Sequence, residues 1–88
     1  MSAEATWLDG NACAGLLAAL FGTEMTTAMR GCASCGALRP LGAHRAYRGA
    51  GIVLRCPQCD EVAMVIAELS ERDVIRVTGS WTFSVGRG

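Results

Sequence analysis

Two Cys-x-x-Cys pairs constrain the fold of this chain more than any other feature of its sequence. Cys32 and Cys35 form the first pair, Cys56 and Cys59 form the second, and the 20 residues 36–55 separate them. Two cysteines three residues apart can bind the same metal ion when the backbone turns tightly between them. Two such pairs supply the four soft ligands of a closed tetrahedral site, so the spacing predicts one structural Zn²⁺ per chain.

The residues beside the cysteines favour such turns. Pro57 has the fixed φ that suits the second position of a turn. Gly36 and Asp60 each follow the second cysteine of a pair, and both residue types tolerate a positive φ. Arg30 and Arg55 lie just upstream of the two pairs and offer positive charge against four thiolates. These neighbours favour a site that builds the fold over a reactive one.

Two other interpretations of the four cysteines stay open. A mononuclear iron site of the rubredoxin type also uses Cys-x-x-Cys-Gly followed by Cys-Pro-x-Cys. This chain lacks the acidic, aromatic-rich composition of that family and carries Asp60 where the second pair would carry glycine. A dithiol redox site would favour a single pair at a helix N-terminus. Cys13, the fifth cysteine, is expected to be a small buried residue on a helix face.

Length and composition bound the class of protein. At 88 residues the chain has room for one domain, residues 1–88, and such short domains often need a metal for stability. The uncharged run over residues 10–23 is shorter than the roughly 20 apolar residues that span a bilayer. The sequence starts Met-Ser-Ala-Glu, without the positive start of a secretory signal. We therefore expect a cytoplasmic protein with no membrane contact, in which paired cysteines bind metal.

Residues 9–21 predict one short helix. Asp9 or Asn11 could cap its start, and Gly22 could end it in the left-handed conformation. Apolar residues recur along it at the spacing of one helix face, and this face should dock on a sheet: Cys13, Leu16, Leu17, Leu20 and Phe21.

Several later segments carry strand patterns, with an irregular stretch over residues 36–42. Residues 62–69 are almost continuously apolar, which is typical of a central strand. Residues 75–85 alternate apolar and polar side chains and predict one half-buried strand with a bulge at Gly79. Shorter strands are expected at 25–30, 43–48 and 51–55. The sequence thus predicts a small α+β fold, with a zinc-ribbon antiparallel β-sheet at about 25–85 and one short N-terminal helix.

The motifs that carry a family resemblance are Leu-Asp-Gly-Asn at 8–11, Leu-Phe-Gly at 20–22, Cys-Ala-Ser-Cys-Gly-Ala at 32–37 and Leu-Arg-Cys-Pro-Gln-Cys at 54–59. Over about residues 25–85 the chain resembles a zinc ribbon. The motifs are similar to those of a family of small uncharacterised actinobacterial proteins, a domain of unknown function with a predicted zinc ribbon. The resemblance implies a metal site at the four matching cysteines and a cytoplasmic setting, and it brings no known activity.

Charge is unevenly distributed, and this asymmetry suggests where a partner could bind. The net charge is zero, but residues 30–55 carry five arginines and no acid. We expect a protein-interaction or adaptor module, for which transcription or translation machinery is one candidate partner. Nucleic-acid binding is the alternative, because arginines and a tyrosine can contact phosphates and bases. The candidate partner-binding residues are Arg39, His44, Arg45, Tyr47 and Arg48.

Catalytic constellations are absent from the sequence. There is no serine–histidine–aspartate set, no phosphate-binding glycine loop and no carboxylate pair with a base. We therefore expect a protein that is not an enzyme. His44, the single histidine, is expected at the surface, because four cysteines already complete a metal site. A homo-oligomer is a further option, since the apolar helix face and the last strand exceed what one small sheet can cover.

Overall fold

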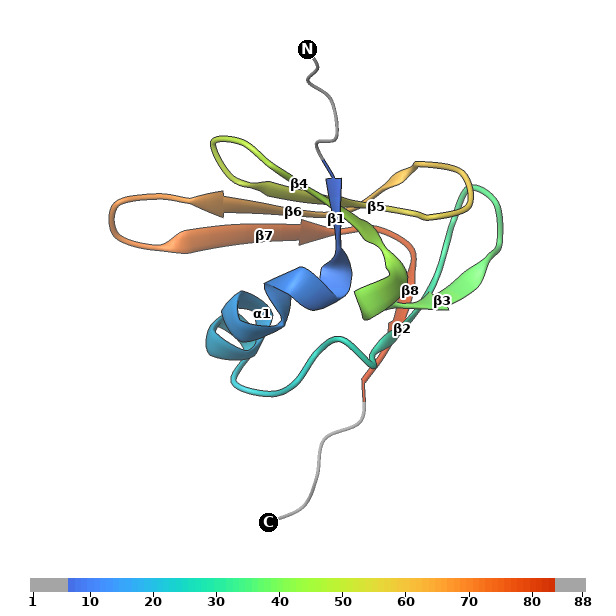
Figure 1. Cartoon of the computed structure of the whole chain (residues 1–88), viewed down its shortest axis with the longest axis horizontal. Helices are drawn as coiled ribbons and strands as arrows, with labels where there is room; N and C mark the ends of the chain where they lie inside the picture. The colour runs from blue at the N-terminus through green and yellow to red at the C-terminus, as the bar shows by residue number, and fades with distance from the viewer. Residues whose placement is uncertain (1–6, 84–88) are drawn as a thin grey trace.

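The computed structural model describes the backbone of residues 7–83 and the side chains of residues 8–83 (Figure 1). Two antiparallel sheets and one short α-helix make up this part of the chain. The elements are β1 (Trp7–Asp9), the 3-10 helix η1 (Gly10–Cys13), α1 (Ala14–Phe21), β2 (Met29–Gly31), β3 (Leu38–Pro40), the 3-10 helix η2 (Leu41–Ala43), β4 (Arg45–Arg48), β5 (Ile52–Arg55), β6 (Val62–Glu68), β7 (Asp73–Val77) and β8 (Ser80–Thr82).

The predicted fold class is confirmed, with the strands divided between two sheets. The larger sheet has the order β1-β4-β5-β6-β7 and the smaller sheet has the order β3-β2-β8. All pairings in both sheets are antiparallel. No helix of the described residues is long and apolar enough to cross a membrane.

The helix forms where the apolar pattern predicts it, although its first turn differs. α1 covers residues 14–21, and the four residues before it form η1. The predicted N-terminal caps are wrong, because Asp9 makes no side-chain cap bond and Cys13 is the residue that precedes α1. Gly22 ends the helix with a φ of 74°, and its N–H donates to the carbonyl of Ala18. The left-handed end is therefore confirmed.

The core lies on one face of the larger sheet. Side chains that alternate along its central strands share this face, and Leu54, Met64 and Ile66 are buried there together with Leu17 of α1. Figure 1 shows α1 on this side of the sheet. Burial of such apolar side chains is the main force that holds a short helix, since an isolated eight-residue helix is unstable in water.

The opposite face of the larger sheet, here called the open face, carries side chains outside the core cluster. Tyr47, Val53, Val65 and Arg76 stand in one row across four strands, because each pairs directly with the next. Directly paired residues of an antiparallel sheet point to the same side. Across the open face, two apolar side chains therefore stand between a tyrosine and an arginine.

The predicted strand over 75–85 is wrong in two respects. The chain leaves β7 at Val77 and enters β8 at Ser80, and these two strands belong to different sheets. Gly79 makes this crossing with a φ of 86°, and a Cβ there would meet the carbonyl oxygen of Gly31. Both strands are also mostly exposed, and residues 84–85 of the predicted strand lie outside the described residues.

Two short strands lie where the sequence shows no clear pattern. β1 precedes the helix, and β3 falls inside the segment expected to be irregular. β3 contains Pro40, which is compatible with its place at the edge of the smaller sheet. The strand predicted at 25–30 is shorter and later than expected, since β2 covers only residues 29–31.

Candidate metal centre

Both Cys-x-x-Cys pairs lie in hairpin turns, one from each sheet. Cys32 directly follows β2, and Cys35 lies in the turn that leads to β3. Cys56 directly follows β5, and Cys59 lies in the turn that leads to β6. The four cysteines therefore come together where an end of the smaller sheet meets an end of the larger one.

The two turns have the same backbone hydrogen bonds. The N–H of Gly36 donates to the carbonyl of Cys32 at 3.0 Å, and the N–H of Asp60 donates to the carbonyl of Cys56 at 2.9 Å. Gly36 has a φ of 76° and Asp60 a φ of 69°. The positive φ predicted for these two positions is thus confirmed.

The four sulfur atoms lie close enough together to bind one ion. All four Sγ atoms lie within 4.8 Å of one another. Cys32 Sγ is 3.6 Å from Cys59 Sγ, and Cys35 Sγ is 3.8 Å from Cys56 Sγ. Metal–sulfur bonds of about 2.3 Å give a tetrahedron with edges of about 3.8 Å. The cluster can therefore hold one metal ion, with Cys32 and Cys56 buried and Cys35 and Cys59 exposed.

The thiols affect one another's charge. Backbone N–H groups of Cys35 and Ser34 lower the pKa of Cys32 to about 6, against the effect of burial. Burial raises the pKa of Cys56, but N–H groups of Cys59 and Gln58 outweigh it, so that pKa is lowered. The backbone at Glu61 lowers the pKa of Cys59, yet burial and the three other sulfurs raise it to about 11. Full deprotonation of this cluster therefore calls for a bound cation.

The two arginines beside the cysteine pairs each make hydrogen bonds to other parts of the chain. Arg55 Nη1 donates to the carbonyl of Asp60 at 3.0 Å and so braces the second turn. Arg30 is only 1% exposed, and its Nε donates to the carbonyl of Thr78 at 2.9 Å. Its Nη2 donates to Thr78 Oγ1 at 3.0 Å, while Nη1 is buried without a hydrogen-bond partner among the described residues. Arg30 thus ties β2 to the crossing between the two sheets.

The predicted surface position of His44 is wrong. The side chain is 1% exposed, and its Nδ1 donates to the carbonyl of Pro40 at 3.0 Å. Its ring stacks on that of Trp81, with 6.4 Å between the ring centroids. Because β8 brings Trp81 over it, His44 is enclosed within the protein and cannot face a partner as expected.

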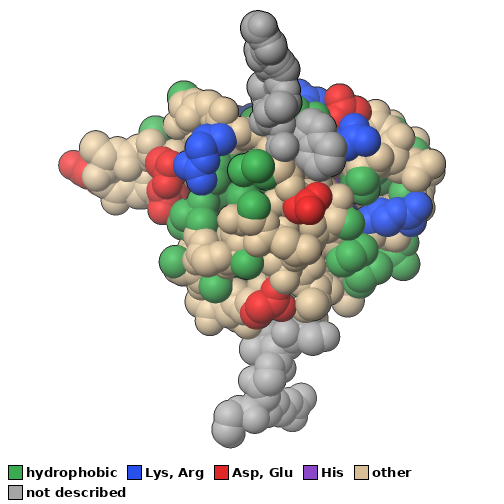
Figure 2. All heavy atoms as spheres, viewed as in Figure 1, with side chains coloured by type: hydrophobic (Ala, Val, Ile, Leu, Met, Phe, Trp, Pro, Cys, Tyr) green, Lys and Arg blue, Asp and Glu red, His purple; other side chains and the backbone are tan. Residues whose placement is uncertain are grey.

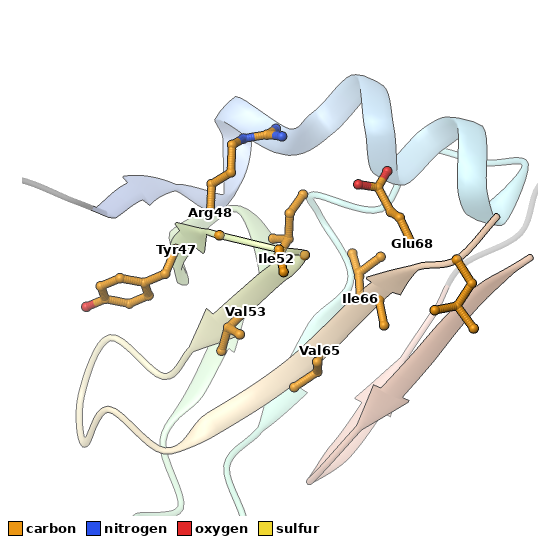
Figure 3. Close-up of a pocket in the computed structure, with 12 residues that line it drawn as sticks. Tyr47, Arg48, Ile52, Val53, Val65, Ile66 and Glu68 are labelled. Atoms are coloured by element: carbon orange, nitrogen blue, oxygen red, sulfur yellow. The ribbon is translucent and has the colours of Figure 1, made fainter.

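The other candidate partner-binding residues lie at separate places. Arg39 is exposed beside the second turn, where its Nη2 donates to Gln58 Oε1 at 3.2 Å. Arg45 and Tyr47 lie on the open face, and Arg48 points to the opposite side from Tyr47 (Figure 3). The structure therefore brings only Arg45 and Tyr47 of the five together on one face.

Three further contacts of aromatic side chains were not expected from the sequence. Trp81 Nε1 donates to the carbonyl of Thr78 at 2.9 Å, and its ring stacks on that of Phe83 with 6.2 Å between centroids. Arg55 also lies over the Tyr47 ring, 5.8 Å from the centroid. The alternation of residues 75–85 indicates that Trp81 points toward the core, but no sequence pattern indicates the change of sheet at Gly79.

A hollow of about 520 Å³ lies at the end of the β4–β5 hairpin and the adjoining end of β6 (Figure 3). Its lining is largely apolar, and Tyr47, Arg48 and Glu68 are the polar side chains in it. Among the described residues that line it, none is a cysteine, serine or histidine. This hollow does not join the cysteine cluster.

Comparison with known proteins identifies the chain's family. One family model matches residues 2–87, and its description is "Family of unknown function (DUF6510)". No curated protein and no solved structure matches the chain.

Proposed function

Because the chain belongs to the DUF6510 family, whose function is unknown, we propose a function from the cysteine cluster: a structural zinc-ribbon protein. One Zn²⁺ binds Cys32, Cys35, Cys56 and Cys59 and joins the two hairpin turns. The observation that carries the proposal is the placement of four Sγ atoms within 4.8 Å. Four thiolates suit zinc and complete its coordination, so the ion has a structural role.

The folded body then serves as a protein-interaction module in the cytoplasm. Cytoplasmic thiols stay reduced, which an all-cysteine zinc site needs. The proposal is of a protein that is not an enzyme, and it rests on the closed coordination that four thiolates give a metal ion, which leaves no open position for a substrate. Transcription or translation machinery is one candidate setting for the partner.

The decisive test is metal content together with stability. We expect purified chain to carry one zinc atom and to unfold when a strong chelator removes it, since the binding energy of such a site is part of the folding energy. Elemental analysis measures the metal, and circular dichroism follows the fold during chelation. An apo chain with unchanged structure and melting temperature would refute the structural role.

The identity of the metal has its own measurement. Zinc gives a colourless protein, and an iron site of the rubredoxin type absorbs visible light. Replacement by Co²⁺ should give the visible bands of a tetrahedral four-thiolate site. Stoichiometric iron in the native protein would replace the zinc proposal with an electron-transfer one.

A further inference from the structure

The edge strand β7 differs from the other sheet edges. The two sheets end in four edge strands among the described residues, which are β1 and β7 in the larger sheet and β3 and β8 in the smaller one. β1, β3 and β8 have three residues each, whereas β7 has five. Short edge strands and edge prolines limit unwanted pairing. β7 is longer and contains no proline or lysine.

The outward backbone groups of β7 can be assigned from its pairing. The N–H of Thr78 donates to the carbonyl of Ala63, which lies on the β6 side. Successive residues of a strand direct their backbone groups to opposite sides. Arg76 therefore bonds to β6, and Ile75 and Val77 present their N–H and carbonyl groups at the edge.

The side chains along this edge favour an apolar neighbour. Val74 is 37% exposed and Val77 is 50% exposed, and Leu69 in the adjoining hairpin is 51% exposed. Exposed β-branched side chains beside unpaired backbone groups are the features to which an additional strand binds. An extended segment placed here would cover both valines and satisfy the outward groups.

Charge specifies the partner further. Arg76 is exposed on the open face, and its sheet neighbours on that face are Val65, Val74 and Thr78, none of which is acidic. The hairpin end of the strand is acidic, where Glu68 pairs directly with Asp73. Figure 2 shows acidic side chains gathered at this end of the molecule. A partner strand thus fits when its carboxylate lies across from Arg76 and no acid lies near Asp73.

A second copy of the chain does not meet this requirement. In a two-fold antiparallel pairing centred on Ile75, Arg76 lies diagonal to Arg72 and Arg76 of the second copy. When the pairing is centred one residue earlier, Arg76 lies directly opposite Arg72 of that copy. When it is centred one residue later, Arg76 lies directly opposite Arg76 of that copy. Like charges at these positions destabilise a sheet, so self-pairing is disfavoured.

We propose that β7 is a docking edge for an extended segment of another protein, which adds as an antiparallel strand and places a carboxylate against Arg76. This inference rests on the proposed interaction role and gives the partner a chemical class. Backbone bonds at Ile75 and Val77 supply affinity, and the contact with Arg76 supplies selectivity.

The test uses the full zinc-loaded chain and a defined probe. The probe is a capped eight-residue peptide in which threonine alternates with valine and one central valine is replaced by glutamate. Saturating peptide should slow hydrogen exchange at the amides of Ile75 and Val77 by about tenfold or more, because these donors become paired. The amides of Val74 and Arg76, already bonded to β6, should change less. No protection at Ile75 and Val77 would overturn the proposal.

Two variants test the backbone hydrogen bonds and the charge contact separately. Val77→Pro removes one outward N–H at an exposed position, and we expect it to abolish peptide protection while zinc content stays unchanged. Arg76→Glu keeps every backbone group, and we expect it to reverse a preference of about fivefold for the glutamate peptide over a lysine peptide. Equal affinity of both peptides for the wild type and the Arg76 variant would overturn the role of charge.

Other kinds of partner would give different experimental results. Sedimentation that showed a dimer broken by Val77→Pro would assign the edge to a second copy and overturn the proposal. Binding of oligouridine at Tyr47 and Arg55, with no peptide protection, would instead assign a nucleic-acid surface. A chain that needs zinc to fold but shows no edge protection refutes the docking edge alone, whereas a chain that folds without zinc refutes the proposed function first.

Discussion

At the scale of single residues, the most informative side chains are polar groups inside the protein. His44 and Arg30 are each 1% exposed, and neither was expected there. Burial lowers the pKa of the His44 imidazole; the bond to the carbonyl of Pro40 raises it, and the charge of Arg30 lowers it. The net shift is downward, so folded His44 is neutral and its Nδ1 holds the proton that Pro40 accepts.

This shift predicts how stability changes with pH. Because the folded pKa of His44 lies below the unfolded value of about 6.5, the unfolded state binds more protons as pH falls. Stability is therefore full above about pH 6.5 and declines below it, by at most about 1.4 kcal/mol per pH unit for this group. Urea unfolding between pH 5 and 8 measures the slope. The variant His44→Phe should lose it, and an unchanged slope at constant zinc content would contradict the assignment.

Glycine substitutions give a second prediction at this scale. Gly79→Ala should destabilise the fold by about 1–3 kcal/mol, because the residue has a φ of 86° and a Cβ would meet the carbonyl of Gly31. Gly15 is the matched control, since it lies within α1 and a Cβ there meets nothing within 4 Å. Gly15→Ala should stabilise by about 0.5–1 kcal/mol. Thermal unfolding of both variants checks the opposite signs, and equal effects would contradict the close approach at Gly79.

At the scale of elements, the two turns that hold the cysteines act as one unit. Cys56→Ser should abolish binding of the ion and collapse the fold, because three thiolates leave the site incomplete. Cys13 is a buried core residue on the helix side and is the matched control. Cys13→Ser should keep one zinc per chain, as elemental analysis would measure. Loss of zinc from this variant would place Cys13 in the metal site.

Local chemistry explains which elements the sequence could predict. The apolar face around Leu17, the run over residues 62–69 and the turns at Gly36 and Asp60 depend on neighbours in sequence, and the structure agrees. Four cysteines at this spacing also predict their own cluster. The features that the sequence does not predict depend on contacts between residues far apart in the chain. The change of sheet at Gly79 places this residue against the carbonyl oxygen of Gly31, which lies far away in the sequence.

Burial of polar residues fails to be predicted for the same reason. His44 reads as a surface residue in isolation, and only the arrival of Trp81 from a remote strand encloses it. Arg30 likewise depends on Thr78, 48 residues away, for both of its hydrogen bonds. The five candidate partner residues are close in sequence, but alternation along β4 directs Tyr47 and Arg48 to opposite faces.

At the scale of the whole molecule, the cysteine cluster lies between two sheets. The first pair belongs to the β2–β3 turn of the smaller sheet, and the second belongs to the β5–β6 turn of the larger one. A bound ion therefore links the two sheets, as the chain itself does at Gly79 and as Arg30 does through Thr78. The smaller sheet has only three-residue strands, so we expect it to lose order first during chelation. Hydrogen exchange at β2 and β5 would compare the two sheets, and simultaneous loss would contradict this order.

The pairing of β2 with β8 also has a consequence for synthesis of the chain. Gly31 pairs with Ser80, so the strand beside the first cysteine gains its second neighbour from the far end of the described chain. All four cysteines leave the ribosome before Thr78 and β8 do. Arg30 is therefore enclosed only after the last strand of the described residues has been made and has paired with β2.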